Sequence, residues 1–567
     1  MRNIRLTIKI GALLFASVLA VEVQAAERAV ERTYVSTDRT VYVAGDMVWC
    51  SVFCRDLSTG RPSGLSSVVY LELHSPEGMV QSAKIALVDG RGAGSFTLQQ
   101  SLPTGNYKLV AYTAQNMNEK DYDYECVSPK ILSVFNAFTC DRVKDGVELV
   151  DDGTYSRMAS SSSGSLPAEG LRVTSDGRIE IDGLDGKDAS VSVSVFHDDG
   201  IVQTSNATIS DFARLVRKPV KAEFVNRRLP DFEGEVIEAR IAGFNPEMIP
   251  QLIGKYAFIS APGNKSDIYS APISEDGRIR FITGNIYSDK EMMTEIEGID
   301  SNLPVHVELV SPFSAPVLPA APKLVMAPSI APALTARAAA MQIEKRFAAD
   351  TLYSFLPIRD NLLFDGKCIQ YVLDDYTRFP TMQEDIVEFI TQLRVRKREN
   401  GKSDIQVRLA NDHNNYGYSR ASSLMMLDGV PVFDQEKILG YDPLLVESVN
   451  IYPYTYFVGS RLYDGIVNFV TYKKTLPSMK FGDSARVVDF QGVSYPAAYT
   501  CASLESGGGY PDYRQTIYWH PLVNVPAGRQ VILDFVAPSY GGRFTVVVEG
   551  LTPDGESIFR ALSFELK

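Results

Sequence analysis

The sequence predicts a multidomain, mainly β protein that also contains one α+β domain. Its 567 residues are enough for several domains of ordinary size, each with its own core. Most of the chain alternates apolar and polar residues with period two. Turn residues recur roughly every eight to twelve positions, the spacing of β-sandwiches. Residues 381–393 show helical spacing instead, which places the α+β domain in the second half.

The first 25 residues have the three parts of a secretory signal peptide. Arg2, Arg5 and Lys9 give a positive start, residues 10–21 form a short apolar stretch, and small residues follow. A stretch this short cannot span a bilayer, and no later apolar run approaches the roughly 20 residues that a spanning helix needs. We therefore expect a signal peptide at 1–25 and an exported mature chain without a transmembrane segment.

Charge and residue spacing argue against several kinds of ligand. The formal net charge of -13 disfavours nucleic acid as a partner, because that surface demands a basic face. The five histidines stand far apart and no close Cys/His pair has zinc spacing, so we expect no metal and no cofactor. Two alternatives stay open for the cysteines: either Cys50 or Cys54 bonds Cys126 or Cys140, or the thiols are buried and free.

Residues 26–138 are predicted to form the first β-sandwich. In the run MVWCSVFC, Val48, Cys50, Val52 and Cys54 share one strand face, whereas Trp49 and Phe53 lie on the other. The elements Asp38-Arg39, Tyr42, Gly45 and Gly105-x-Tyr107 arrive in the order found in a known family. On these residues the segment resembles the second macroglobulin-type domain of the alpha-2-macroglobulins and of bacterial envelope proteins that share it.

Three further segments are expected before the α+β domain. Residues 139–228 form a second β-domain that contains a Ser/Gly-rich loop at 151–170, too polar to order itself. Residues 229–311 are an Ig-like β-domain, since their opening strand resembles the carboxypeptidase-regulatory type of module. Residues 312–335 are rich in Pro and Ala, and proline at this density predicts an extended linker without helix or sheet.

Residues 336–476 form the predicted α+β domain. Thr381 and Glu384 make a capping box before a helix, and hairpin turns are expected at Asn400-Gly401 and Asp428-Gly429. The order of a helix, LDGVPV, DPLLVESVNIY and GIVNFVT resembles the plug of TonB-dependent outer-membrane receptors. A receptor barrel needs over about 200 residues after its plug. We therefore expect no barrel in this chain, and a C-terminal β-domain at 477–567 that contains a Tyr-Trp-His-Pro signature at 518–521.

These observations predict an exported, non-catalytic binding or scaffolding protein of the Gram-negative envelope, periplasmic or associated with the outer membrane. The plug resemblance implies an accessory role in an outer-membrane transport or assembly complex, with an envelope protein as partner and a barrel among the candidates. No nucleophile or phosphate-binding motif is present, so catalytic residues are not expected.

Two alternatives to the scaffolding role stay open. One is an envelope enzyme with an unrecognised site. The other is a macroglobulin-like protein that binds proteases. The trapping chemistry of that family requires a Cys-x-Glu-Gln thioester sequence, which none of the six cysteines begins.

One aromatic cluster is the candidate contact surface for a partner. Tyr452, Tyr454, Tyr456 and Phe457 lie close together around a predicted Pro-Tyr-Thr-Tyr loop. Large aromatic side chains anchor many protein interfaces. The alternative, since the flanking strands are apolar, is that these rings pack in the core.

Overall fold

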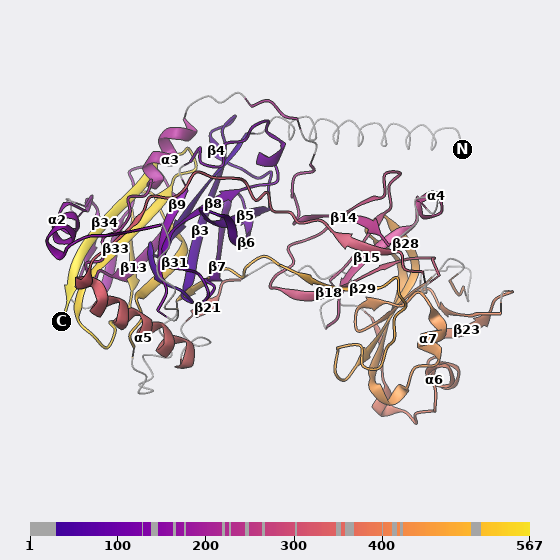
Figure 1. Cartoon of the computed structure of the whole chain (residues 1–567). Coiled ribbons are helices and arrows are strands. Elements are labelled where there is room, and N and C mark those ends of the chain that lie inside the picture. The colour runs from indigo at the N-terminus through magenta and orange to yellow at the C-terminus, as the bar shows by residue number, and fades with distance from the viewer. Residues whose placement is uncertain are drawn as a thin grey trace. The chain divides into compact units, whose positions relative to one another are not determined.

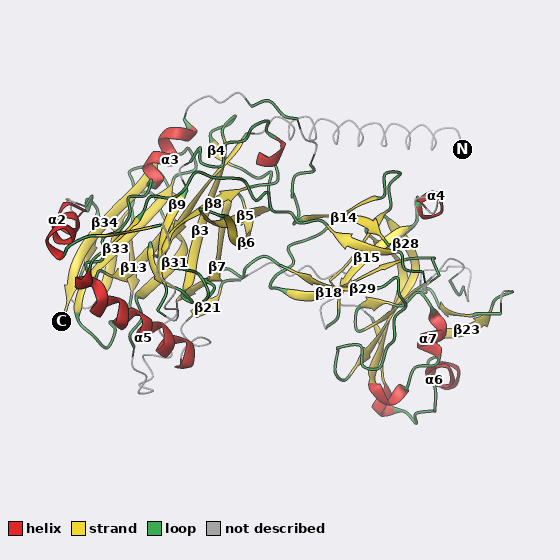
Figure 2. Ribbon diagram, in the orientation of Figure 1, coloured by secondary structure: helices red, strands yellow, loops and turns green. Residues whose placement is uncertain are grey.

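The computed structural model describes residues 30–567 apart from short gaps (Figures 1 and 2). The residues outside the description are 1–29, 128, 138–145, 163–165, 175–176, 218–221, 226–227, 244–248, 264–266, 301–302, 348–352, 358–367, 400, 411–416, 420–422 and 500–511. The predicted signal peptide at 1–25 therefore lies outside the described residues. Among the helices described, none is both long and apolar enough to cross a membrane.

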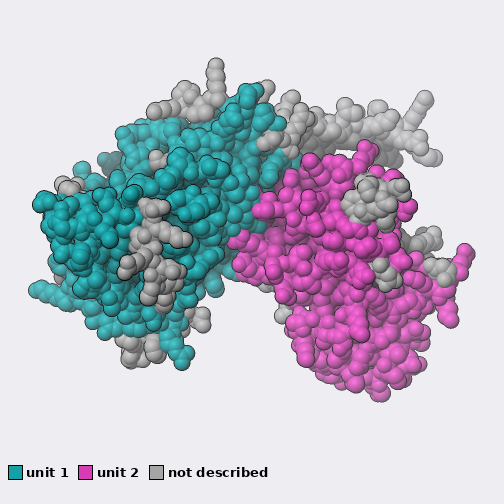
Figure 3. All heavy atoms as spheres, viewed as in Figure 1, with its two compact units in different colours: residues 1–232, 313–358, 493–567 teal, residues 233–312, 359–492 magenta. Residues whose placement is uncertain are grey.

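The chain divides into two compact units, each assembled from segments that are distant in sequence (Figure 3). Unit 1 consists of residues 1–232, 313–358 and 493–567, and unit 2 consists of residues 233–312 and 359–492. Strands dominate both units, which confirms the predicted mainly β, multidomain fold class (Figure 2).

Unit 1 begins with a β-sandwich over residues 30–135, called the N-terminal sandwich below. Its strands follow the order β1-β3-β7-β6-β5-β8-β9-β2, with β4 beside β3. The elements are β1 Glu31–Thr37, β2 Val41–Val43, β3 Met47–Asp56, β4 Arg61–Pro62, β5 Val68–Ser75, β6 Gly78–Val88, β7 Arg91–Thr97, β8 Gly105–Tyr112, η1 Asn116–Asn118 and β9 Lys130–Phe135.

Strand β3 is buried on both faces, as its alternation predicts. One face contributes to the sandwich core, through Val48, Cys50, Val52 and Cys54. The other face carries Trp49 and Phe53, which are also buried but pack in separate clusters. A strand with two apolar faces requires a second layer of protein outside the sandwich.

The motif residues of the N-terminal sandwich form a buried polar network. Asp38 accepts hydrogen bonds from the Tyr42 hydroxyl (2.8 Å) and the Trp49 backbone N–H (3.0 Å). Arg39 donates to Asp38 at 2.9 Å and to Asp46 at 2.8 Å. Since every charge here has a partner, the network fixes the turn that joins β1 to β3.

A second sandwich combines residues 171–197 with residues 516–566. One sheet has the order β11-β12-β32. The other has the order β31-β13-β33-β34, which can be followed in Figure 1. The strands are β11 Leu171–Val173, β12 Arg178–Asp182, β13 Ala189–His197, β31 Thr516–Val525, β32 Gln530–Asp534, β33 Gly542–Leu551 and β34 Ser557–Leu566. The sequence analysis assigned these two ranges to separate domains, 139–228 and 477–567. Instead, β13 pairs with both β31 and β33.

The predicted Ser/Gly-rich loop is wrong over most of its length, because α2 covers Asp152–Ser162. Asp151 caps this helix through the backbone N–H of Thr154 (2.9 Å). The Tyr155 ring is buried, and its hydroxyl accepts a hydrogen bond from the Val202 backbone N–H (2.9 Å). The cap and the buried ring anchor a stretch whose composition is polar. A further helix, α3 Ile209–Val216, begins with a capping box.

Only the first half of the predicted Pro/Ala-rich linker, residues 312–323, lacks helix and strand. Phe313 packs edge-on against Tyr70 at a centroid distance of 5.7 Å. Further on, β20 Leu324–Met326 pairs in parallel with β10 Val147–Leu149, and η3 Pro328–Ile330 leads into α5 Ala331–Phe347. Proline is tolerated in the first turn of a helix, where its missing N–H would have no partner. The prediction that prolines exclude helix and sheet is therefore wrong here. A last small pair in unit 1 joins β21 Tyr353–Phe355 and β30 Ala497–Tyr499.

Unit 2 contains an Ig-like β-sandwich with sheets β17-β14-β19 and β16-β15-β18-β29. Its elements are β14 Val236–Ala242, α4 Ile249–Leu252, β15 Tyr256–Ala261, β16 Asp267–Pro272, β17 Arg278–Ile282, β18 Lys290–Ile296, β19 His306–Leu309 and β29 Arg486–Phe490. Strand β29 comes from the range that the sequence analysis gave to the C-terminal β-domain, yet it pairs with β18.

The rest of unit 2 is an α+β region, and its sheet has the strand order β22-β27-β28-β25-β26. Its elements, with the separate hairpin β23–β24, are β22 Ile369–Val372, η4 Leu373–Asp375, α6 Met382–Glu388, β23 Leu393–Lys397, β24 Ser403–Val407, β25 Leu424–Leu427, β26 Val430–Pro431, α7 Gln435–Leu439, η5 Pro443–Leu445, β27 Val446–Val458 and β28 Arg461–Thr471.

The local signals predicted for this region are confirmed. Thr381 and Glu384 form the capping box of α6. Strands β23 and β24 pair on either side of the predicted Asn400-Gly401 turn, in which Gly401 has positive φ (83°) and Asn400 lies outside the described residues. Asp428 and Gly429 both have positive φ (49° and 84°), as a tight hairpin turn requires.

Candidate functional site

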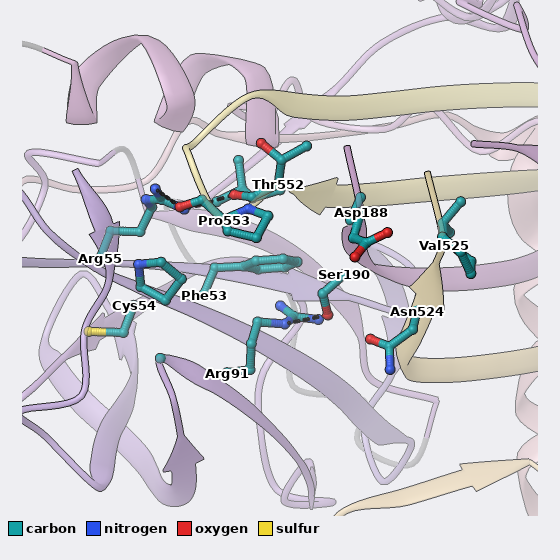
Figure 4. Close-up of a pocket in the computed structure, with 15 residues that line it drawn as sticks. Phe53, Cys54, Arg55, Arg91, Asp188, Ser190, Asn524, Val525, Thr552 and Pro553 are labelled. Carbon is teal, nitrogen blue, oxygen red and sulfur yellow. Dashed lines mark hydrogen bonds between the residues drawn. The ribbon is translucent and has the colours of Figure 1, made fainter. Parts of the chain in front are cut away.

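A cavity of about 410 Å³ lies in unit 1 between the two sandwiches (Figure 4). It is called the interface pocket below. The ends of β3 and β33 and the starts of β7 and β13 surround it, and β31 ends beside it. Its wall is mainly apolar, formed by Phe53, Pro62, Val525, Leu551 and Pro553. The pocket lies where the second face of β3 meets the layer that covers it.

Arg91 lines this pocket and joins the two sandwiches. Its guanidinium carbon lies 3.4 Å from the centroid of the Phe53 ring. Its N–H groups donate to oxygen atoms of both sandwiches, namely Ser190 Oγ (3.1 Å), the Val52 carbonyl (3.2 Å), Ser51 Oγ (3.3 Å) and the Pro521 carbonyl (3.0 Å). All four acceptors are neutral. Burial lowers the pKa of Arg91 to about 9, because no carboxylate offsets the loss of water around the charge.

Arg55 lines the same pocket and is buried. It donates to the backbone carbonyls of Thr552 (3.1 Å), Pro553 (2.9 Å) and Gly60. Its Nε is buried and has no hydrogen-bond partner among the described residues. Burial lowers the pKa of Arg55, and the charge of Asp554 opposes that shift in part. Figure 4 shows Arg55 and Pro553 on one side of the Phe53 ring and Arg91 on the other.

Neither arginine forms an ion pair with any residue that the structure describes. Two carboxylates lie close enough to consider. Asp188 lines the pocket but is exposed, and it accepts a hydrogen bond from the Ala527 backbone N–H (2.8 Å). Asp554 is exposed and pairs with Lys187 at 3.1 Å. The pocket therefore combines an apolar wall with two positive charges that no carboxylate of the described residues pairs with.

The groups of the pocket favour binding over chemistry. Guanidinium groups stay protonated at neutral pH and do not exchange protons with a substrate. The one thiol nearby, Cys54, is buried, and burial raises its pKa well above the usual value, which suppresses the reactive thiolate.

The predicted contact residues lie on strand β27 rather than on a loop. The β27–β28 pairing shifts register between Tyr452 and Thr455, so a β-bulge stands where the sequence predicted the Pro-Tyr-Thr-Tyr loop. Tyr454 and Phe457 are 45% and 70% exposed. Tyr452 and Tyr456 pack against a small core cluster and stack edge to face at 6.2 Å. Their role in partner contact stays a prediction, and the bulge divides them into an exposed pair and a packed pair.

The described residues contain no metal-binding cluster, and four of the cysteines are free thiols. Within the described ranges, no group of three or more His, Cys, Asp or Glu side chains is placed to hold a metal ion. Cys50, Cys54, Cys126 and Cys368 are free thiols, while Cys140 and Cys501 lie outside the described residues. The two buried thiols, Cys50 and Cys54, follow the free-thiol alternative.

The sequence analysis missed the interface pocket, although one signal was present. On the outer face of β3, the residues alternate as Trp49, Ser51, Phe53 and Arg55. A serine and an arginine among aromatic rings on a buried face are unusual, because buried polar groups need partners. The residues that complete the site come from β7, β13, β31 and β33, and no local sequence pattern predicts that they lie close together.

Comparison with protein families identifies the N-terminal sandwich. Residues 32–125 match the family described as MG2 domain. The predicted macroglobulin-type domain is therefore confirmed for this segment, which contains Asp38, Arg39, Tyr42 and Asp46 of the buried polar network. The comparison with curated proteins found no match.

Comparison with solved structures found bacterial alpha-2-macroglobulins. Against Escherichia coli alpha-2-macroglobulin activated by porcine elastase, identity is 10%, 94% of this chain and 43% of that chain are covered, and the TM-score is 0.23. Against Salmonella alpha-2-macroglobulin reacted with methylamine, identity is 10%, coverage is 95% and 23%, and the TM-score is 0.16. This chain spans less than half the length of either protein, and scores this low do not establish a shared overall fold.

Proposed function

We propose that this chain is a non-catalytic protein-binding protein of macroglobulin type, with a proteinase as the first partner to test. The observation that carries the proposal is the MG2 domain at residues 32–125. Protease binding is one of the alternatives from the sequence analysis, and the family match favours it over a purely scaffolding role.

The chemistry of the MG2 domain supports a binding role. The motif residues Asp38, Arg39, Tyr42 and Asp46 bond to one another and are buried, so they stabilise the fold. Thr516 of the second sandwich joins the same network by donating to Asp38 and accepting from Arg39 (2.7 Å). The network thus joins the two sandwiches of unit 1, and a rigid scaffold of this kind lowers the entropic cost of binding a partner.

Any capture of a proteinase by this chain is expected to be non-covalent. A thioester trap needs a cysteine that begins a Cys-x-Glu-Gln sequence, and none of the six cysteines does so. Cys50 and Cys54 are also buried, and burial raises the pKa of each thiol well above its usual value.

The test is to mix the purified exported chain with serine, cysteine and metalloproteinases and to follow complex formation by analytical ultracentrifugation. Residual proteinase activity is measured on a large protein and on a short peptide. We expect a complex with at least one proteinase that dissociates in denaturant. Absence of a complex with every proteinase class, for a chain shown to be folded, would remove the proteinase from the proposal.

A second candidate function is the envelope accessory role implied by the plug resemblance. It is supported by the α+β sheet of unit 2, in which α6, β25, β27 and β28 come from the segments that carry that resemblance. Cross-linking in intact envelopes, followed by identification of the captured protein, tests this role. Capture of an outer-membrane barrel supports it, and capture of only water-soluble proteins contradicts it.

A further inference from the structure

We propose that the interface pocket binds a small organic anion in which a carboxylate is joined to an apolar body. Arg55 receives the carboxylate through its unused Nε and Nη1 groups, and Arg91 adds positive charge from the other side of the Phe53 ring. The apolar wall around Phe53 and Leu551 holds the body. This inference concerns a small ligand and does not depend on the protein-binding function proposed above.

The positive charge of the pocket favours an anionic ligand. Burying a guanidinium without a carboxylate is unfavourable, and folded proteins normally pair such groups. Here two guanidinium groups line one cavity, and neither is ion-paired within the described part of the chain. Arginine cannot relieve the cost by losing its proton at neutral pH. An anion from outside the chain would neutralise the pair.

The two arginines also have N–H groups left over for hydrogen bonds to a ligand. A guanidinium has five N–H groups. Arg91 uses four of them on neutral oxygens, which leaves one on Nη1. Arg55 uses three on backbone carbonyls, which leaves the buried Nε and one on Nη1. Planar carboxylates accept hydrogen bonds from guanidinium groups in a matching fork, and such charge-assisted bonds are strong.

The volume and the mainly apolar lining of the cavity also suit such a ligand. Ligand pockets typically measure roughly 300–1,000 Å³ and are mainly apolar with a few fixed polar groups. The interface pocket, at about 410 Å³, falls within this range. Phe53, Val525, Leu551 and Pro553 supply the apolar surface. A bare inorganic anion would leave most of this surface in contact with water, so an anion with an apolar body fits better.

Two acidic side chains near the pocket do not take the place of such a ligand. Asp188 is exposed at the rim and is engaged with a backbone N–H. Asp554 is held by Lys187, which also pairs with Glu556 at 2.5 Å. Their charges reduce the attraction of the rim for anions, so selectivity must come from the two arginines inside.

The test uses two probes of nearly equal shape, 2-naphthoate and its neutral amide 2-naphthamide. Affinities for the full exported chain are measured by isothermal titration calorimetry. We expect 2-naphthoate to bind at least about tenfold more tightly than the amide, because only the anion gains the charge-assisted hydrogen bonds. Equal affinities, or no binding of either probe, would overturn the proposal.

Three variants locate the binding. Arg91→Met and Arg55→Met remove one charge each and should reduce the preference for the anion. Arg172→Met is the matched control, since Arg172 is an exposed arginine of unit 1 that pairs with Glu180 at 3.0 Å. Circular dichroism and thermal melting check that each variant is folded.

A fourth variant keeps the proposal testable if loss of a buried arginine unfolds the chain. Asn524 is exposed and lines the pocket, so Asn524→Trp should block the cavity without disturbing buried groups. We expect this variant to lose binding of both probes. Unchanged binding of 2-naphthoate in folded Asn524→Trp, or in both folded arginine variants, would place the anion elsewhere and contradict the inference.

Discussion

Arg32 and Arg55 lie directly opposite each other in the β1–β3 ladder, yet their surroundings differ. Arg32 makes two hydrogen bonds to the Glu119 carboxylate, at 2.7 and 2.9 Å, inside the N-terminal sandwich. Arg55 lies at the boundary with the second sandwich and bonds only to backbone carbonyls. Both arginines belong to the MG2 domain. The one inside the sandwich has a carboxylate partner, whereas the one at the pocket has no carboxylate partner among the described residues.

Glu295 of unit 2 is a third charged side chain to compare with the two arginines. One carboxylate oxygen of Glu295, on β18, is buried and has no hydrogen-bond partner within the described residues. Burial raises the pKa of Glu295 to about 8, with the positive charge of Lys437 opposing the shift. A glutamate can keep its proton and become neutral, but an arginine cannot. The same lack of a partner therefore produces a neutral acid in unit 2 and a standing positive charge in the interface pocket.

The largest expected effect comes from breaking the neutralised pair. Glu119→Gln leaves the Arg32 guanidinium buried without a counter-charge, since the two side chains are only 8% and 5% exposed. We expect a loss of about 3–5 kcal/mol in the free energy of unfolding, measured by denaturant titration.

The matched control for this variant is Glu223→Gln, which breaks the exposed pair of Lys120 and Glu223. It should lose less than about 1 kcal/mol. Similar losses in both variants would show that burial does not set the value of the Arg32–Glu119 pair.

The next effect is stabilisation by the anionic probe. If the interface pocket binds 2-naphthoate, a free concentration of 100 times Kd should stabilise the wild-type protein by about 2.7 kcal/mol. Differential scanning calorimetry measures the accompanying rise in Tm. Arg55→Met should show a smaller rise, whereas Glu223→Gln should respond like the wild type. An equal rise in Tm in all three proteins would show that the probe stabilises them without binding in the interface pocket.

A pH effect of about 2 kcal/mol is expected in unit 2. The folded pKa of Glu295 is raised, so its contribution to stability is present at low pH and is lost as pH rises through about 8. The figure is roughly half of what the full shift would give, because the side chain is partly exposed. Hydrogen exchange in β15 and β18, compared between pH 5 and pH 9, measures the change.

Glu295→Gln tests the assignment of that pH effect. The amide cannot ionise, so the variant should keep its protection in β15 and β18 at pH 9 better than the wild type does. A pH dependence that is the same in both proteins would show that another group is responsible.

The smallest effect on stability is expected at the exposed aromatic pair of β27. Tyr454→Ala with Phe457→Ala should change the free energy of unfolding by no more than about 0.5 kcal/mol per site, since both rings face solvent. Partner capture should nevertheless fall if the pair anchors a partner. A pull-down with the double variant measures it.

Two controls sharpen that experiment. Ile282→Ala removes another exposed apolar side chain of unit 2, 52% exposed, and should leave capture unchanged. Tyr452→Ala removes a packed ring and should lower stability more than the double variant does. Unchanged capture by the Tyr454 and Phe457 double variant would remove this strand from consideration as a contact surface.

The sequence by itself determined the local features of this protein. The capping box at Thr381 and Glu384, the positive-φ turn at Asp428-Gly429 and the two faces of β3 follow from contacts within a few residues. The MG2 motif belongs to this class as well, because Asp38, Arg39, Tyr42 and Asp46 bond mainly to one another. Such features depend on backbone geometry and short-range hydrogen bonds, which a sequence pattern encodes directly.

Only the tertiary structure decided which distant segments share a sheet. Strand β13 pairs with β31 and β33, more than 300 positions further along the chain. The alternation of apolar and polar residues predicts each strand but does not show which other strand it pairs with. The interface pocket depends on these pairings, since Arg55, Arg91, Ser190 and Leu551 meet only when the two sandwiches are in contact. Burial without a counter-charge is a property of that assembled boundary, and so it could not be read from any one segment.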